Sequence, residues 1–215
     1  SALATPGLWR NRDFVTVLLG QGISNLGDGV TATALPLLVL QLTGSGVAMG
    51  VVSMLQLLPN VVFGLPAGAL ADRSDRRHLL FAVDAGRALL TALIPLALLL
   101  RLPVMPVVYI VALPLGALAA LFFATYSASV PLLAGRAHLG RATSTFQAVQ
   151  SLAWIAGPGV AGLLATRIGP GRTLALDAAS FVVSAGSIWL VRRPLRGARP
   201  APESRVMHEM REGLA

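Results

Sequence analysis

The chain has 215 residues, of which 55% are hydrophobic and only 12% are charged. Soluble domains carry about 25% charged residues, so this composition is typical of an integral membrane protein. The sequence contains no cysteine, which excludes disulfides and thiolate metal sites. The formal net charge is +8, and all 17 basic residues are arginine. Because these arginines fall between apolar segments, membrane topology explains them better than a nucleic-acid partner, and we expect no such partner.

Six apolar segments are each long enough to cross the hydrocarbon core of a bilayer, which needs about 20 residues per helix. They cover residues 15–41, 46–70, 79–100, 104–128, 145–166 and 173–191. The connections between them are too short to hold a folded soluble domain. The sequence therefore predicts an all-α polytopic membrane protein, with a six-helix transmembrane bundle over residues 1–191 and a basic cytoplasmic linker or tail over residues 192–215.

The arginines are distributed unevenly between the two sides of the predicted bundle. One side holds Arg10, Arg12, the cluster at 73–77, Arg136, Arg141 and the run at 192–199. The other side holds only Arg101, Arg167 and Arg172. Because cytoplasmic loops carry the excess of basic residues, both termini are expected in the cytoplasm. Six spans also divide into two units of three, and the second copy of an odd-numbered unit must insert inverted.

The connection between the second and third spans carries the most informative motif. Residues 68–80 read Gly-Ala-Leu-Ala-Asp-Arg-Ser-Asp-Arg-Arg-His-Leu-Leu. This order resembles the loop between helices two and three of the major facilitator superfamily, roughly G-x-L-A-D-R-x-G-R-R. The matching residues are Gly68, Leu70, Ala71, Asp72, Arg73, Arg76 and Arg77. Asp75 stands where the family usually has glycine, and aspartate adopts positive φ less readily, so the turn departs from the family pattern there.

Asp84 and Arg87 lie one helical turn apart near the cytoplasmic end of the third span, where opposite charges can pair. We expect them to join the nearby loop arginines in a charge network at the helix ends rather than to form a substrate site. The resemblance implies that this loop stabilises one side of an alternating-access cycle. The candidate residues of this conformational-switch loop are Gly68, Asp72, Arg73, Arg76, Arg77, Asp84 and Arg87.

Polar residues follow one face of the first span. Asp28 lies near its middle, where a charge costs at least about 2.5 kcal/mol. Gln21, Ser24, Asn25 and Thr31 recur with it at three- and four-residue steps, so this face should point into the bundle or a wet cavity. Two interpretations remain open: Asp28 binds protons or substrate, or it is a structural carboxylate satisfied by neighbouring helices or by the backbone around Gly27 and Gly29.

Weaker polar stripes occur on three other spans. They comprise Ser53, Gln56 and Asn60; Gln147, Gln150, Ser151 and Trp154; and Asp177, Ser180, Ser184 and Ser187. Each stripe could line a cavity, but hydrogen bonding between helices is the favoured interpretation. Asp177 is predicted near the outer end of its span, where water lowers the cost of its charge. The candidate substrate or proton pathway residues are Asp28, Gln21, Asn25, Gln56, Asn60, Gln150 and Trp154.

The fifth span carries a second motif, Ala-Gly-Pro-Gly-Val-Ala-Gly at residues 156–162. Small residues at four-residue steps form a ridge that lets helices approach closely: Ala153, Gly157, Ala161 and Ala165. The motif resembles the G-P-x-x-G-G element in the fifth helix of facilitator antiporters, most of which are exporters. Gly157, Pro158 and Gly162 match, with alanine at the first of the paired glycines. The resemblance favours export over uptake.

The segments 27–36, 84–87 and 177–181 look like those of exporters related to enterobactin and macrolide efflux proteins. The chain resembles the amino-terminal six of the family's twelve helices, with an inverted three-plus-three repeat. This implies proton-coupled export of a small amphipathic molecule, such as a drug or siderophore, across a bacterial plasma membrane. It also implies a missing carboxy-terminal six-helix half, or a second copy, as partner.

Two alternatives from other classes remain open. The chain could be a truncated or non-transporting membrane scaffold, or a half-transporter that must dimerise. An enzyme is not expected, since no convincing nucleophile and base pair occurs. The histidines at 78, 138 and 208 lack the spacing of metal ligands, and no phosphate-binding glycine loop is present, so we expect neither metal nor cofactor.

Overall fold

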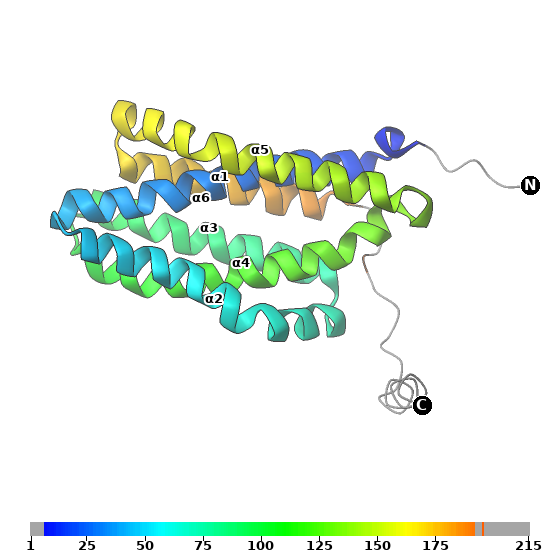
Figure 1. Ribbon diagram of the computed structural model, residues 1–215, viewed down its shortest axis with the longest axis horizontal. Helices are drawn as coiled ribbons and strands as arrows, with labels where there is room; N and C mark the ends of the chain where they lie inside the picture. The colour runs from blue at the N-terminus through cyan, green and yellow to red at the C-terminus, as the bar shows by residue number, and fades with distance from the viewer. Residues whose placement is uncertain (1–6, 192–194, 196–215) are drawn as a thin grey trace, which may run out of the picture.

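The computed structural model describes residues 7–191 and residue 195, which form a bundle of long helices (Figure 1). The long helices are α1 (Arg12–Thr43), α2 (Gly46–Arg73), α3 (Arg76–Leu99), α4 (Val104–Ala134), α5 (Leu139–Ile168) and α6 (Pro170–Trp189). Two short 3₁₀ turns, η1 (Leu8–Arg10) and η2 (Arg136–His138), precede α1 and α5. The all-α prediction is confirmed, and each predicted span corresponds to one long helix. Apart from residue 195, the predicted tail at 192–215 lies outside the described residues.

Five of the helices, among the described residues, are long and apolar enough to cross a membrane: α1, the Gly46–Gly64 part of α2, α3, α4 and α5. Helix α6 is less apolar because one of its faces carries Asp177 and three serines. Those side chains are buried, since α6 packs against α1 and α3. The transmembrane placement of α6 therefore remains a prediction, although the helix itself forms.

Polar caps extend several helices beyond the apolar segments that predicted them. The side chain of Asn11 accepts a hydrogen bond from the Phe14 N–H at 3.3 Å, and Ser45 accepts one from Ala48 at 3.2 Å. Asp75 caps α3 by accepting from the N–H of Arg77 at 3.1 Å. Its φ is −70°, so the aspartate at the family's glycine position needs no left-handed backbone. Only Ser74 and Asp75 separate α2 from α3.

The helices alternate in direction, so the two ends of the described chain lie together with the α2–α3 and α4–α5 connections (Figure 1). We call this the termini end of the bundle. The most extensive contacts join α2 with α4, α1 with α6, α3 with α6, α1 with α5, and α3 with α4. If α1, α2 and α3 are matched with α4, α5 and α6, the α2–α4 contact corresponds to the α1–α5 contact, and the α1–α6 contact corresponds to the α3–α4 contact. The α3–α6 contact corresponds to itself. This pattern is the one expected of two three-helix units related by an inverted repeat.

Two equivalent helix crossings depend on glycine. A Cβ placed on Gly157 would lie 2.7 Å from the Cα of Gly29, where α5 crosses α1. A Cβ on Gly116 would lie 2.5 Å from the carbonyl oxygen of Gln56, where α4 crosses α2. The three residues of the predicted packing motif of α5 do not share one face. Gly157 lies in the crossing, whereas Gly162 has open space around its missing side chain and Pro158 is exposed, because both lie on other faces of α5.

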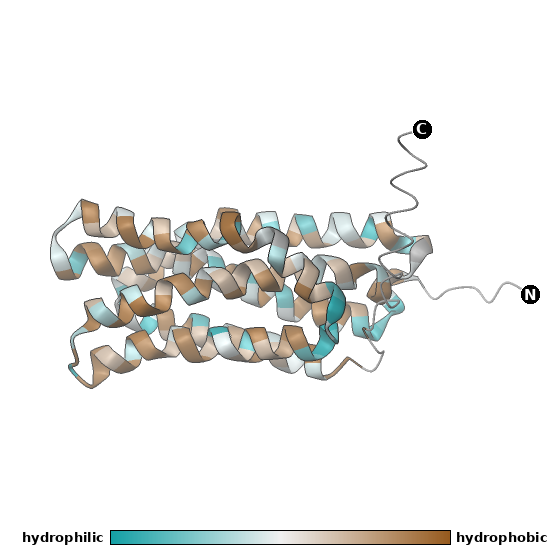
Figure 2. Ribbon diagram, turned by 90° about the horizontal axis from the view of Figure 1, so that it is seen from below, coloured by the Kyte–Doolittle hydropathy of each residue, from teal (hydrophilic) through white to brown (hydrophobic). Residues whose placement is uncertain are grey.

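The interior of the bundle has three layers. One apolar cluster, including Leu35, Ile94 and Val108, lies away from the termini end. Two others, which include Leu80 and Phe14, lie near the termini end. Buried polar side chains of α1, α3 and α6 occupy the layer between them. Many large apolar side chains are exposed on the helices. Strongly hydrophilic residues gather at the α2–α3 turn (Figure 2).

Candidate functional site

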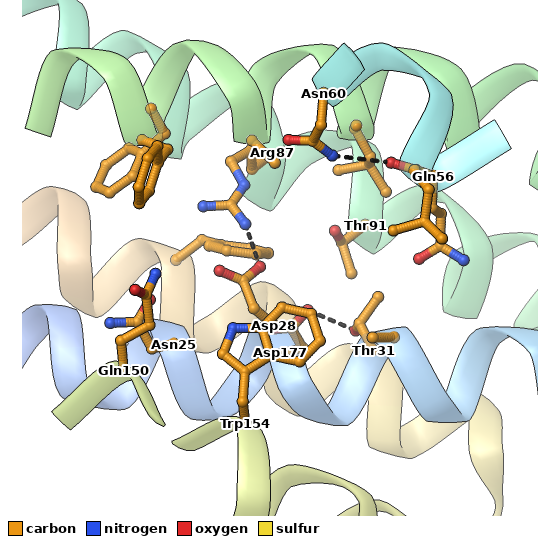
Figure 3. Close-up of a pocket in the computed structure, with 18 residues that line it drawn as sticks. Asn25, Asp28, Thr31, Gln56, Asn60, Arg87, Thr91, Gln150, Trp154 and Asp177 are labelled. Carbon is orange, nitrogen blue, oxygen red and sulfur yellow. Dashed lines mark hydrogen bonds and ion pairs between the residues drawn. The ribbon is translucent and has the colours of Figure 1, made fainter. Parts of the chain in front are cut away.

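A cavity of about 220 Å³ lies in the polar middle layer, and all six long helices contribute to its wall. Six of the seven residues predicted for a substrate or proton pathway line it (Figure 3): Asn25, Asp28, Gln56, Asn60, Gln150 and Trp154. The seventh, Gln21, lines a second cavity of about 140 Å³, which shares Asn25 and Gln150 with the first. The structure thus brings together side chains that the sequence placed on three separate spans.

An ion pair between α1 and α3 lies on the wall of the larger cavity. The Nη2 of Arg87 donates to Oδ1 of Asp28 (Figure 3). The Arg87 side chain is only 4% exposed, whereas Asp28 is 27% exposed. The guanidinium also lies 4.0 Å from the ring centre of Phe181 and 5.6 Å from that of Phe122, both within the range of cation–π attraction. Residues of three other helices therefore hold this arginine.

Asp84 is a second carboxylate beside the same arginine. Its Oδ1 lies 3.7 Å from Nη1 of Arg87, which is an ion pair without a hydrogen bond. Its Oδ2 accepts from the hydroxyl of Ser184 at 2.5 Å, and that hydroxyl in turn accepts from Nε2 of Gln21 at 2.6 Å. Asp84 is fully buried. These bonds tie α3 to α6 and α6 to α1.

The expectation that Asp84 and Arg87 join the loop arginines is wrong, although the two residues do pair with each other. Their further partners are Asp28 on α1 and Ser184 on α6. The physical reason is distance along the helix. At 1.5 Å per residue, Arg87 lies roughly 16 Å from the start of α3, within the polar middle layer. Arg87 is therefore a cavity residue.

Asp177 also differs from its prediction. It is only 1% exposed, and it lines the cavity instead of meeting water at the end of a span. It accepts hydrogen bonds from Thr31 at 2.5 Å and Ser180 at 2.9 Å. A Cβ on Gly27 would overlap its carboxylate, so this glycine makes the close approach of α6 to α1 possible. Asp177 lies two turns inside α6, which begins at Pro170.

The predicted conformational-switch loop is mostly helical and links helix ends. Arg76 donates to Asp72 at 3.0 Å and to the carbonyl of Ala128 on α4 at 2.8 Å. Arg77 donates to the carbonyl of Trp189 at the end of α6, and its guanidinium lies 5.4 Å from the centre of that indole. Asp72 and Arg73 are exposed. A Cβ on Gly68 would meet nothing within 4 Å.

Sequence reasoning did not place several residues in the cavity: Arg87, Thr91, Phe122, Phe123, Asp177 and Phe181. The polar stripe on the sixth span was the available signal for Asp177. The aromatic residues gave none, because an isolated phenylalanine in a membrane span is normally a packing residue. In residues 7–191, no cluster of three or more histidine, cysteine or acidic side chains is arranged to hold a metal ion.

Sequence comparison decides the family. The pattern of the Major Facilitator Superfamily matches residues 17–213. The chain belongs to the major facilitator superfamily. The predicted resemblance is confirmed, and together with the apolar helices it makes the chain a multi-pass membrane protein.

Relatives of this facilitator chain include named efflux proteins. It is 29% identical over 208 residues to macrolide efflux protein A of Streptococcus pyogenes, covering 94% of this chain and 50% of the relative. It is 34% identical over 200 residues to multidrug efflux pump Tap of Mycolicibacterium fortuitum, covering 90% of this chain and 48% of the relative. The chain spans about half the length of the curated relatives it matches. The similarity to efflux exporters is therefore confirmed for this half.

Proposed function

We propose that this facilitator chain forms the amino-terminal half of an exporter that moves a small amphipathic molecule out of the cytoplasm in exchange for protons. The observation that carries the proposal is Asp28 on the cavity wall, paired with the buried Arg87. A carboxylate that faces a cavity inside a membrane bundle can release its proton only if a cation or water compensates its charge. Asp28 faces the cavity and is paired with a cation, the guanidinium of Arg87. The efflux relatives support the direction of transport.

The wall of the cavity supports an amphipathic substrate such as a drug or siderophore. Trp154, Phe123 and Leu115 offer apolar contact, and the amide side chains of Asn25, Gln56, Asn60 and Gln150 offer hydrogen bonds. Pockets for small molecules usually combine a mainly apolar wall with a few polar groups that fix orientation. Substrate and proton would meet at Asp28, so that binding of one favours release of the other.

A second six-helix body is needed to complete such a site. Helices α2 and α5 carry large exposed apolar side chains, among them Val47 and Val61 on α2 and Ile155 on α5, at 78%, 84% and 78% exposure. Both helices also line the cavity. We therefore propose that a carboxy-terminal half, or a second copy of this chain, covers this side. A non-transporting scaffold would leave the polar cavity and its ion pair without a use.

The orientation in the membrane can be tested by labelling. Arg76, Arg77 and Arg141 lie at the termini end, so we propose that this end faces the cytoplasm of a bacterial cell. Single cysteines at Gly44 and Gly169 should react with an impermeant thiol reagent in intact cells. Cysteines at Ser74 should react only after the cells are opened. The reverse pattern would invert the proposed topology.

The exchange of protons for substrate is tested at Asp28. In a protein that contains both halves, reconstituted in liposomes, Asp28→Asn should reduce export driven by a pH gradient to the rate seen without a gradient. Asp28→Glu is the matched control, because it keeps a carboxyl group that can bind a proton. Export by Asp28→Asn at the wild-type rate would falsify the coupling role and leave Asp28 as a structural partner of Arg87.

A further inference from the structure

Arg87 lies between two carboxylates that belong to different helices. Its Nη2 donates to Asp28 on α1, while its Nη1 lies 3.7 Å from Oδ1 of Asp84 on α3. Two buried atoms in this arrangement have no hydrogen-bond partner, namely Oδ1 of Asp84 and Nε of Arg87. Buried polar atoms are nearly always satisfied in native structures. An unmet acceptor on Asp84 and an unmet donor on Arg87, two side chains that approach to 3.7 Å, therefore point to a second arrangement of the same side chains.

The geometry makes that second arrangement accessible without moving the backbone. Asp84 and Arg87 are three residues apart on α3 and therefore share one face of the helix. The guanidinium has five donors in a planar fork, so a small rotation can satisfy Asp84 Oδ1 after Asp28 is released. The contact with the Phe181 ring, at 4.0 Å, can hold the guanidinium in the same pocket during this rotation.

We propose that Asp84 is a positioning residue that holds Arg87 whenever Asp28 gives up the ion pair, so that the arginine alternates between the two carboxylates. This inference rests on the proposed exchange at Asp28. A buried arginine without a counter-charge is strongly unfavourable, because the low dielectric of the bundle penalises an isolated ion. With Asp84 as second partner, Asp28 can bind a proton or release one while Arg87 remains compensated.

Among the described residues, Arg87 forms ion pairs with Asp28 and Asp84 and with no other charged group. Asp177 of α6 is held by Thr31 and Ser180. Helix α4 has no charged residue, and the charges of α2 and α5 lie at their ends. Among the described residues of the middle layer, Arg87 therefore faces Asp28 from α1, Asp84 from its own helix and Asp177 from α6.

The first test compares the stability of carboxylate variants of the full chain in detergent. Asp28→Asn and Asp84→Asn should each leave Arg87 one partner, so each should keep most of the folded protein after heating. The folded fraction that remains in the double variant should be at least about tenfold lower than the product of the folded fractions of the two single variants. Adding Arg87→Gln to the double variant should restore part of it, since the uncompensated charge is then gone.

The matched control is Asp28→Asn combined with Asp177→Asn, which leaves Asp84 in place for Arg87. The folded fraction of this control should equal the product of the folded fractions of its two single variants. The proposal is overturned if the Asp28→Asn/Asp84→Asn pair behaves like this control. It is also overturned if Asp84→Asn alone is as damaging as the double variant, because Asp28 would then be insufficient as a partner.

A second test follows Asp28 itself and needs no transport. A hydrophobic carbodiimide modifies protonated carboxyl groups, so its attachment to Asp28, measured by mass spectrometry, reports when Arg87 has left. In the wild type, labelling should rise as the pH is lowered. In Asp84→Asn, Arg87 has no alternative partner and stays on Asp28, so the rise in labelling should shift to lower pH. In Asp177→Asn, Arg87 keeps both partners, so the labelling of Asp28 should follow the wild-type profile. An unchanged profile in Asp84→Asn contradicts the alternation, and this holds whether or not the protein exports.

Discussion

The chain has two clusters of aspartate and arginine side chains that differ in their exposure to solvent. The cavity cluster, Asp28, Asp84 and Arg87, lies in the middle of the bundle, and the last two side chains are 0% and 4% exposed. The turn cluster, Asp72, Arg76 and Arg77, lies at the termini end, where Asp72 is 62% exposed. An exposed ion pair contributes little to stability, whereas removing one partner of a buried pair is strongly destabilising. The turn cluster can therefore open and close at small cost, while Arg87 in the cavity cluster needs a carboxylate partner at all times.

Removal of one arginine from each environment tests most strongly whether burial sets its contribution to stability. Arg87→Leu leaves two carboxylates in the bundle without a cation and should lower the free energy of unfolding by about 3 kcal/mol or more. Arg73→Leu, at the exposed turn, should change it by less than about 0.5 kcal/mol. Unfolding in mixed micelles measures both. Equal effects would show that burial does not distinguish the middle layer of the bundle from the exposed turn.

The second prediction concerns the crossing that holds the cavity cluster in place. Gly157 packs on Gly29, the residue next to Asp28, so Gly157→Leu should force α5 away from α1 at the level of the ion pair. We expect a loss of roughly 1–3 kcal/mol in the free energy of unfolding, as for overpacked cores. Gly162→Leu is the control on the same helix, since a side chain there meets open space. A thermal midpoint unchanged by Gly157→Leu would contradict the close crossing.

Only a small effect on stability is expected at Asp72. Asp72→Asn removes the charge that Arg76 meets at 3.0 Å, but Arg76 keeps the carbonyl of Ala128. The free energy of unfolding should fall by less than about 1 kcal/mol. Transport in a protein containing both halves should nevertheless slow, because the turn links the ends of α2, α3 and α4. Normal transport together with a normal yield of folded protein would remove Asp72 from the switching role.

The sequence predicted helices and their order well because bilayer length and hydrophobicity constrain each span locally. It also predicted which faces of α1, α2 and α5 are polar, and six of those residues meet at one cavity. Periodicity suffices for this, because it orients each helix about its own axis. The extra turns of helix were missed at capped ends, where Asn11 and Asp75 stabilise helix outside the apolar segment.

The partners of Arg87 and Asp177 could not be predicted, since they depend on how far each helix slides past its neighbours. Arg87 meets Asp28 across 59 positions of sequence, and Thr31 meets Asp177 across 146. Because of the motif at the α2–α3 turn, the sequence assigns Asp84 and Arg87 to the network of the turn arginines, whereas they belong to the cavity cluster. Glycines 27, 29 and 157 set the approach of α1 to its neighbours, and their spacing alone does not say which helix each one faces.

The packing order of the helices has a consequence for how the protein is made. Helix α1 has its most extensive contacts with α5 and α6, and α2 with α4, whereas α2 and α3 touch little although only two residues join them. At a synthesis rate of about 5–20 residues per second, α1 waits on the order of ten seconds for α6 to emerge. During that time Gln21 and Thr31 on its buried polar face lack Ser184 and Asp177, their hydrogen-bond partners on α6. Assembly of this half is therefore completed from its last helices, and chaperoning within the membrane should matter most for α1 and α2.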